Sequence, residues 1–118
     1  MNPGDLVEVD WHDSSGGRAE SIRSLKKIDI PVKSWGIYLG DYGEEEPHIV
    51  LMTEIYFKKV GNIGFEVNAI VKRVVKRSRV LIPNAFDISQ IAARHIESKV
   101  NDALLMHKIR FCVEVSKW

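Results

Sequence analysis

The stretch Ser34-Trp35-Gly36-Ile37-Tyr38-Leu39-Gly40-Asp41 gives the strongest indication of the fold of this chain. Its Trp, Ile and Tyr side chains favour a β-strand, and the glycines of the adjoining Gly40–Gly43 segment tolerate a tight turn. An earlier strand is predicted over residues 6–11, where acidic residues interrupt apolar ones. We therefore expect the quoted stretch to form the second strand of a small sheet.

Further strands are predicted downstream. They are expected at His48–Met52, at Ile55–Phe57 and over Phe65–Val75, with a turn at Gly61-Asn62 joining the last two. The longest strand candidate is Ala69–Leu81, whose apolar runs are broken by pairs of basic residues. One face of that strand is therefore expected to be strongly positive.

The main helix is predicted to begin near Asp87. This residue has the form of an N-cap, and Gln90 three residues later has the form of its capping-box partner. Apolar residues then recur at spacings of three and four, which places them on one stripe of a helix. They are Ile88, Ile91, Ala92, Ile96, Val100, Ala103 and Leu104. The apolar segment Ile109–Val115 is compatible with a strand or a helix.

Together these elements predict an α+β fold, in which an antiparallel sheet of four to six strands packs on one main helix. A chain of 118 residues suffices for a single domain, residues 1–118, with one core. Hydrophobic content of 45% and charged content of 28% are close to globular averages, so disorder over most of the chain is not expected. Residues 12–27 have the composition of a flexible loop.

Composition also excludes some classes of function. The net charge of +1 gives no strong global field, so attraction to a polyanion has to come from a local patch. A single cysteine cannot form an internal disulfide. No apolar run is long enough to cross a bilayer, and the N-terminus has no signal-peptide core.

Two blocks of the sequence resemble a known family. Gly4-Asp5-Leu6-Val7-Glu8-Val9 matches an opening Gly-Asp-Leu-(Val/Ile)-Glu-(Val/Ile) block. Ser34–Asp41 matches a His-(Trp/Tyr)-(Ala/Gly)-Ile-Tyr-(Val/Leu)-Gly-Asp block except at its first position. The chain thus resembles the lecithin retinol acyltransferase and small phospholipase/acyltransferase family, within the NlpC/P60-like, papain-related thiol enzymes.

This resemblance implies an NlpC/P60-like fold for the single domain over residues 1–118. It also implies that the loop at residues 12–27 is an insertion, because the family separates the two blocks by only a few residues. It also implies transfer or hydrolysis of phospholipid acyl chains through an acyl-cysteine intermediate. The related histidine-box proteins of picornaviruses are similar in size, which implies a replication-associated viral role as a further expectation.

The resemblance gives three residues a place in the family's active site. Cys112 falls at the nucleophile, which the family places at the start of a late helix, and His48 falls near its second histidine. Ser34 stands where the family has its general base, and a hydroxyl cannot take that role near pH 7. Considered without the resemblance, Cys112 is also typical of a small buried residue, and His48 of a solvent-facing residue at a strand start.

The remaining histidines are weaker candidates. His12 lies in the expected loop and could approach Cys112 as a substitute base, although a loop is a poor support for one. His95 and His107 lie on or just past the predicted helix, where packing or capping is expected of them. No spacing of His, Cys, Asp and Glu resembles a metal motif, so no metal or other cofactor is expected.

A basic cluster is the other candidate site. It consists of Lys72, Arg73, Lys76, Arg77 and Arg79. These side chains could contact the phosphates of RNA or of anionic lipid, or could form an ordinary solvated strand face. The interleaved aromatic residues that would favour single-stranded nucleic acid are absent from this segment.

The leading hypothesis is therefore a divergent domain of this family that has lost ordinary catalysis and acts as a binding or regulatory module. One alternative is an active thiol acyltransferase or phospholipase that uses Cys112. Another is an RNA- or anionic-membrane-binding module that uses residues 72–79. The expected partners are accordingly a phospholipid or membrane surface, RNA or another protein, and the expected location is cytoplasmic or membrane-associated.

Overall fold

The computed structural model describes the backbone of residues 1–13, 30–57 and 63–116, and the side chains of these segments except Ile63 and those beyond Leu105. Most of the expected loop at residues 12–27 and the expected turn at Gly61-Asn62 lie outside the described residues. His12 itself belongs to the first strand, which continues to Asp13.

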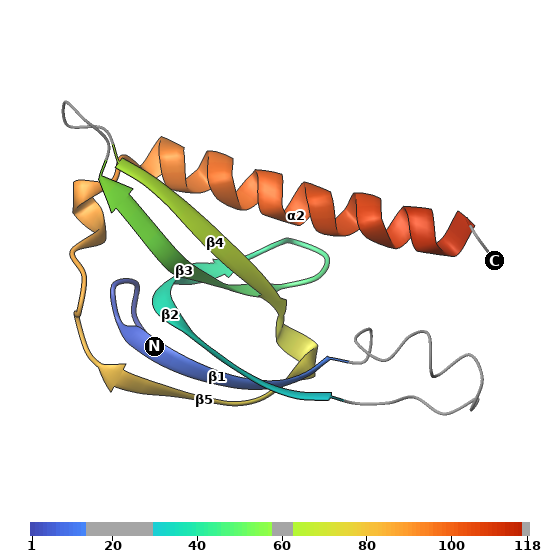
Figure 1. The fold of residues 1–118 in the computed structure, drawn as a ribbon, viewed down its shortest axis with the longest axis horizontal. Coiled ribbons are helices and arrows are strands. Elements are labelled where there is room, and N and C mark those ends of the chain that lie inside the picture. The colour runs from blue at the N-terminus through green and yellow to red at the C-terminus, as the bar shows by residue number, and fades with distance from the viewer. Residues whose placement is uncertain (14–29, 58–62, 117–118) are drawn as a thin grey trace.

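Five strands form one antiparallel sheet with the order β4-β3-β2-β1-β5 (Figure 1). They are β1 Leu6–Asp13, β2 Ile30–Tyr42, β3 His48–Phe57, β4 Ile63–Val71 and β5 Val75–Ile82. A single long helix, α2, spans Ala93–Ser116. The prediction of an α+β fold with a four- to six-stranded antiparallel sheet and one main helix is confirmed at this level.

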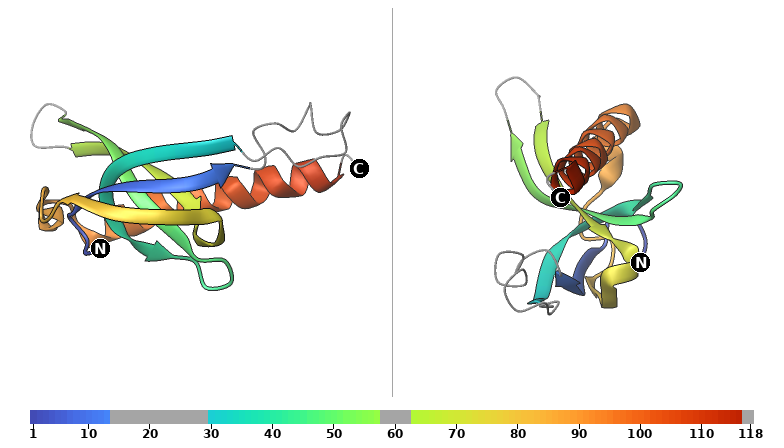
Figure 2. Two further views of the ribbon diagram at one scale, coloured as in Figure 1. Left: turned by 90° about the horizontal axis from the view of Figure 1, so that it is seen from below. Right: turned by 90° about the vertical axis from the view of Figure 1, so that its right-hand side faces the viewer.

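The predicted long strand over Ala69–Leu81 is wrong as a single element. The short 3₁₀ helix η1, Lys72–Val74, interrupts it, so that β4 pairs with β3 and β5 pairs with β1. In a flat sheet these two edge strands would lie about 19 Å apart, since neighbouring strands are about 4.8 Å apart. Because only three residues connect them, the sheet has to curl into a partly closed barrel, as Figure 2 shows.

A bulge in β2 allows this curvature. The register between β2 and β3 shifts between Tyr38 and Gly40, and Gly40 has a φ of 135°, which L-residues rarely adopt. Tyr38 and Leu39 are consecutive in β2, so they point to opposite faces and join different hydrophobic clusters.

Two clusters make up the core, one on each face of the sheet. The inner cluster lies inside the curl and contains Val7, Val9, Tyr38, Ile49, Leu51 and Ile70. The outer cluster lies between the sheet and the helical segment and contains Leu39, Val50, Met52, Phe65, Ile91, Ile96 and Val100. Alternate residues of the first half of β3 enter the two clusters, so both faces of the strand are buried over His48–Met52.

The start of the helix differs from the prediction. Asp87 caps a short 3₁₀ helix, η2 (Ile88–Gln90), by accepting a hydrogen bond from the backbone N–H of Ser89 rather than from Gln90. The α-helix begins only at Ala93. The apolar stripe is nevertheless correct in its main members, since Ile91, Ile96 and Val100 are buried. The ambiguous segment Ile109–Val115 is helical in its backbone.

Candidate functional site on the outer face of β1, β2 and β5

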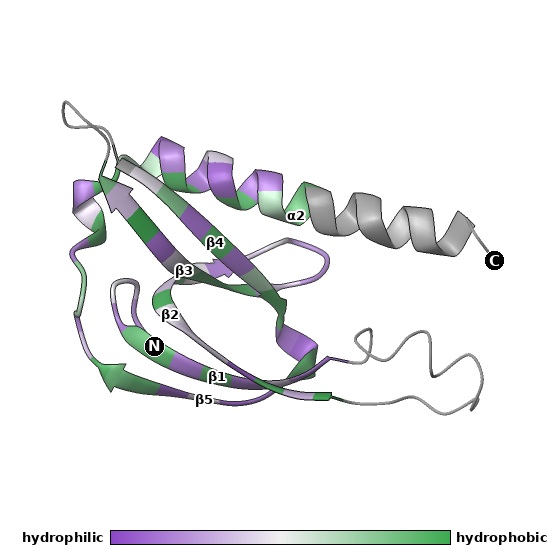
Figure 3. Cartoon of the chain, in the orientation of Figure 1, coloured by the Kyte–Doolittle hydropathy of each residue, from purple (hydrophilic) through white to green (hydrophobic). Residues whose placement is uncertain are grey.

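The outer face of β1 carries two carboxylates at the centre of a charged surface. Glu8 and Asp10 alternate with the fully buried Val7 and Val9, so they point away from the inner cluster. Figure 3 shows the hydrophilic middle and the hydrophobic end of the neighbouring strand β5. Within the described part of the chain, no helix covers this part of the sheet (Figure 1).

Three basic side chains cover these carboxylates. Arg79 donates to Glu8 over 2.7 Å, and Arg77 donates to Asp10 through Nε and Nη2 over 3.2 and 3.0 Å. Lys33 of β2 lies 3.6 Å from Glu8 and 3.2 Å from Asp10. The Glu8 side chain is only 7% exposed, whereas those of Arg77 and Arg79 are 70% and 62% exposed. The acids thus lie beneath a layer of cations.

These contacts keep both acids ionised. The hydrogen bond from Arg77, followed by that from Lys33, lowers the pKa of Asp10. Burial acts to raise the pKa of Glu8, but the hydrogen bond from Arg79 and the charges of Arg79 and Lys33 together hold it below its usual value.

The predicted basic cluster is divided by η1. Lys72 pairs with Asp41 and Arg73 with Glu46, so these two cations are tied to the end of β2 and the turn that follows it. Lys76, Arg77 and Arg79 belong to β5. Of the five, Lys76 has no ion pair with a carboxylate among the described residues.

Trp35 completes the charged face and was missed as a functional residue. It is 53% exposed and pairs with Glu8 across the β1–β2 ladder, while Glu8 pairs with Arg79 on its other side. Directly paired residues project to the same face, so Trp35 and Arg79 flank Glu8 about 10 Å apart. The absence of aromatic residues from the basic segment is therefore offset by a tryptophan from β2. In the sequence, Lys33 and Trp35 lie two residues apart, and this spacing could have indicated that both project from one face of a strand.

A hollow of about 390 Å³ opens at the end of this face. It is lined by Asp10, Trp11, His12, Pro31, Val32, Lys33, Lys76 and Arg77. The β1–β5 register shifts between Asp10 and Trp11, which inserts Lys76 as an extra residue beside Arg77. This bulge brings both cations to the hollow.

The structure does not bring Ser34 and His48 together. Ser34 lies toward the inner face, where its Oγ accepts a hydrogen bond of 3.0 Å from Trp11 Nε1. His48 pairs with Tyr42, eight residues further along β2 from Ser34, which corresponds to about 26 Å of extended strand. His48 is buried rather than solvent-facing, and its Nδ1 lies 2.6 Å from the carbonyl oxygen of Glu46.

Cys112 lies in the second half of α2, nineteen residues after Ala93, where the family would place its nucleophile at a helix start. Its side chain and that of His107 are outside the described part of the structure. Among the described residues, no group of three or more His, Cys, Asp and Glu side chains could hold a metal ion.

The residues that carry the family resemblance have clear structural roles. Asp5 accepts hydrogen bonds of 2.8 Å from the backbone N–H groups of Asn2 and Asn84. Asp41 accepts from the Tyr38 hydroxyl over 2.7 Å and from Lys72 over 2.8 Å, which ties β2 to η1. Both Gly-Asp pairs therefore organise turns and strand ends.

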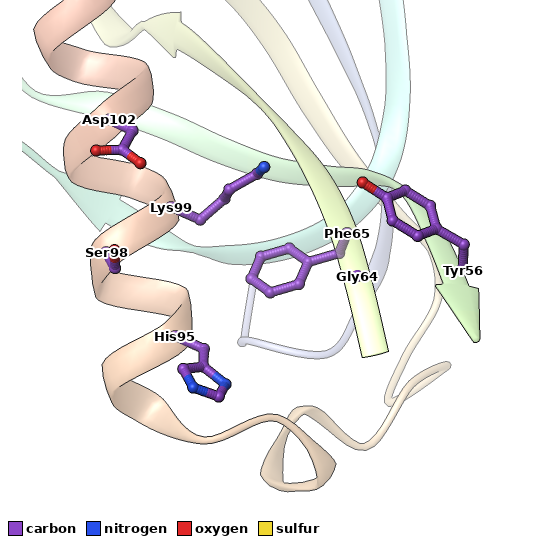
Figure 4. A pocket seen from close by; sticks show the side chains of 7 residues that line it. All are labelled: Tyr56, Gly64, Phe65, His95, Ser98, Lys99 and Asp102. Atoms are coloured by element: carbon purple, nitrogen blue, oxygen red, sulfur yellow. The ribbon is translucent and has the colours of Figure 1, made fainter. Parts of the chain in front are cut away.

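A second, shallower hollow of about 240 Å³ lies between α2 and the β3–β4 pair (Figure 4). It is lined by Tyr56, Gly64, Phe65, His95, Ser98, Lys99 and Asp102. Glu66 Oε1 accepts from the Tyr56 hydroxyl over 2.8 Å and from Lys99 over 3.3 Å, so both lining side chains are held to one carboxylate. These contacts fasten the helix to the sheet edge.

Comparisons of the chain with protein-family models, with curated proteins and with solved structures gave no match. Within the described residues, none of the helices has both the length and the apolar character required to cross a membrane.

Proposed function

We propose that this protein is a non-catalytic binding domain, a divergent relative of the lecithin retinol acyltransferase family with an NlpC/P60-like origin. The family proposal is supported by the two matching blocks, which form the adjacent strands β1 and β2 and pair in register from Leu6 with Ile37. The loss of catalysis is supported chiefly by the separation of Ser34 from His48.

The chemistry of thiol acyl transfer explains why this separation matters. The thiol needs an imidazole within hydrogen-bond reach, and the imidazole needs a partner that orients it. Ser34 already accepts a hydrogen bond from the Trp11 indole, and His48 lies at the other end of β2. Removal of the general base typically costs about two to four decades of rate.

Reactivity of Cys112 with iodoacetamide between pH 5 and 10 tests this proposal, with Cys112→Ser as the blank. We expect alkylation to follow an ordinary thiol, whose pKa is about 8.5, or to require unfolding. His48→Gln should leave the profile unchanged. A native reaction that saturates well below pH 8, and that His48→Gln shifts to higher pH, would show an activated thiol and would favour the alternative of an acyltransferase or phospholipase that uses Cys112.

A further inference from the structure

We infer that the outer face of β2, β1 and β5 binds single-stranded nucleic acid, with Trp35 as a stacking platform for a base and Lys33, Arg77 and Arg79 as phosphate contacts. The inference rests on the proposed function as a binding domain and names the partner of that domain.

The first observation is that Trp35 is exposed on a rigid support. Its side chain belongs to neither hydrophobic cluster. The backbone beneath it is fixed, because the next residue, Gly36, packs so closely on β3 that an added Cβ would lie 2.8 Å from the carbonyl oxygen of Met52. A large aromatic surface held at an exposed place on a central strand is suited to stacking, since every base has a π-face.

The second observation is that the surrounding cations are already oriented. Arg77 and Arg79 are each held by a carboxylate of β1, yet both side chains remain mostly exposed. A guanidinium has five N–H donors, so one ion pair leaves donors available for phosphate oxygens. With Lys33 and Lys76 included, this face carries two more positive than negative charges. Its local charge is therefore complementary to a phosphate backbone.

The neighbours of Trp35 favour nucleic acid over a membrane surface. The residues beside it in its cross-strand row are Glu8 and Arg79, both charged. Insertion into a lipid interface would require these groups to leave water, which is costly for ions. A single-stranded nucleic acid can instead place a base on the Trp35 indole, with the phosphates of its backbone over the cations at either side.

The shape of this face also favours single-stranded over double-stranded nucleic acid. The face is the outside of a curled sheet, and among the residues that the structure describes no helix projects from it to enter a groove (Figure 2). Stacking on an aromatic side chain requires a base that is free of its neighbours.

Binding of fluorescein-labelled twelve-nucleotide oligouridine and oligothymidine, followed by anisotropy, tests this inference. Trp35→Ala should weaken binding about ten-fold, and Trp35→Phe should restore most of the loss, because the base loses its stacking partner only in the first variant. The matched control is Phe57→Ala, which removes an aromatic residue that is 74% exposed at the far end of β3. This control should bind as the unaltered protein does.

The cations are tested through salt dependence. The paired substitution Glu8→Gln with Arg79→Gln removes one phosphate-contacting cation together with the carboxylate beneath it. The net charge of the face is therefore unchanged, and only the Arg79 contact is lost. The paired substitution should weaken binding several-fold at low salt and should reduce the slope of log affinity against log salt by about 0.7. Lys99→Ala, on the helix, should leave both quantities unchanged.

The possible results separate the two proposals. Equal binding by Trp35→Ala and the unaltered protein, or no oligonucleotide binding at all, overturns the inference. Trp35-dependent binding to phosphatidylserine vesicles in the absence of oligonucleotide binding overturns it in favour of a membrane surface. Neither result changes the proposed loss of catalysis, which fails only if Cys112 proves to be an activated thiol.

Discussion

At the scale of single residues, Asp5 shows how one residue can join three segments of the chain. One oxygen accepts from Asn2 and the other from Asn84, while its backbone carbonyl accepts from Tyr38 over 2.9 Å. Gly4 beside it has a φ of 102°, and a Cβ there would lie 2.6 Å from the Phe86 carbonyl oxygen. The Gly-Asp pair is therefore explained by packing and turn geometry alone.

This arrangement predicts a pH-dependent contribution to stability. The backbone hydrogen bonds from Asn2 and Asn84 lower the pKa of Asp5 below its usual value of 3.8. The contribution is thus complete above the unfolded pKa and is lost as the pH falls through the lower folded pKa. Asp5→Asn should destabilise the protein at pH 7, because an amide can accept only one of the two N–H groups, and the deficit should shrink at about pH 4 and below.

Urea unfolding of Asp5→Asn and of the unaltered protein, from pH 2.5 to pH 7, measures the difference in their free energies of unfolding. Glu45→Gln is the control, since it removes an exposed carboxylate in the turn after β2. A constant deficit for Asp5→Asn across the whole range would show that the ionised carboxylate contributes nothing beyond its shape.

At the scale of elements, the helix is held to the sheet by a short run of buried side chains. Ile96 and Val100 of α2 pack on Leu39, Val50, Met52 and Phe65 in the outer cluster. Toward Leu105, the last residue of α2 whose side chain is described, the sheet covers the helix less, and Leu105 itself is 55% exposed. The first turns of α2 therefore carry most of the packing of its described part.

Truncation of one residue from each region should separate these contributions. Ile96→Ala is expected to lower the free energy of unfolding by about 2–4 kcal/mol, through lost burial and the cavity left behind. Leu105→Ala should change it by less than about 0.5 kcal/mol, since exposed sites away from special features usually tolerate substitution. Chemical denaturation gives both values, and equal effects would contradict the packing described.

The elements also show which features the sequence could predict. The alternation of the strands and the apolar stripe of the helix could be predicted from the sequence, because both depend on local periodicity. The interruption at Lys72–Val74 was not, since apolar and basic residues continue through it and only the pairing of β4 and β5 with different partners requires a turn. Asp87 is a cap as predicted, but Ile91 is buried with an extended backbone, so the α-helix begins only at Ala93.

The site was less predictable than the fold for a related reason. The basic residues were evident, but their acidic partners Glu8 and Asp10 are about seventy residues away in the chain. Trp35 lies on a third strand, so the face exists only after three strands have paired. Spacing within one segment carries no information about such a surface.

At the scale of the whole molecule, β3 connects the two halves of the core. Ile49 and Leu51 belong to the inner cluster, and Val50 and Met52 belong to the outer one. By contrast, β5 is an edge strand that pairs only with β1, and most of its residues are exposed. Opening of the barrel at β5 therefore disrupts fewer buried contacts than any separation that involves β3.

This difference predicts the order in which backbone amides exchange with solvent. Amides over His48–Met52 should be the most protected and should exchange only through global unfolding, because both faces of that segment are buried. Amides of Val75–Ile82 should exchange through a lower-energy opening of the sheet edge. Hydrogen exchange followed by mass spectrometry, with urea added below the unfolding transition, distinguishes the two routes. Exchange in β3 should accelerate steeply with urea and exchange in β5 only weakly. Equal protection and equal urea dependence in both strands would mean that the barrel opens as one cooperative unit.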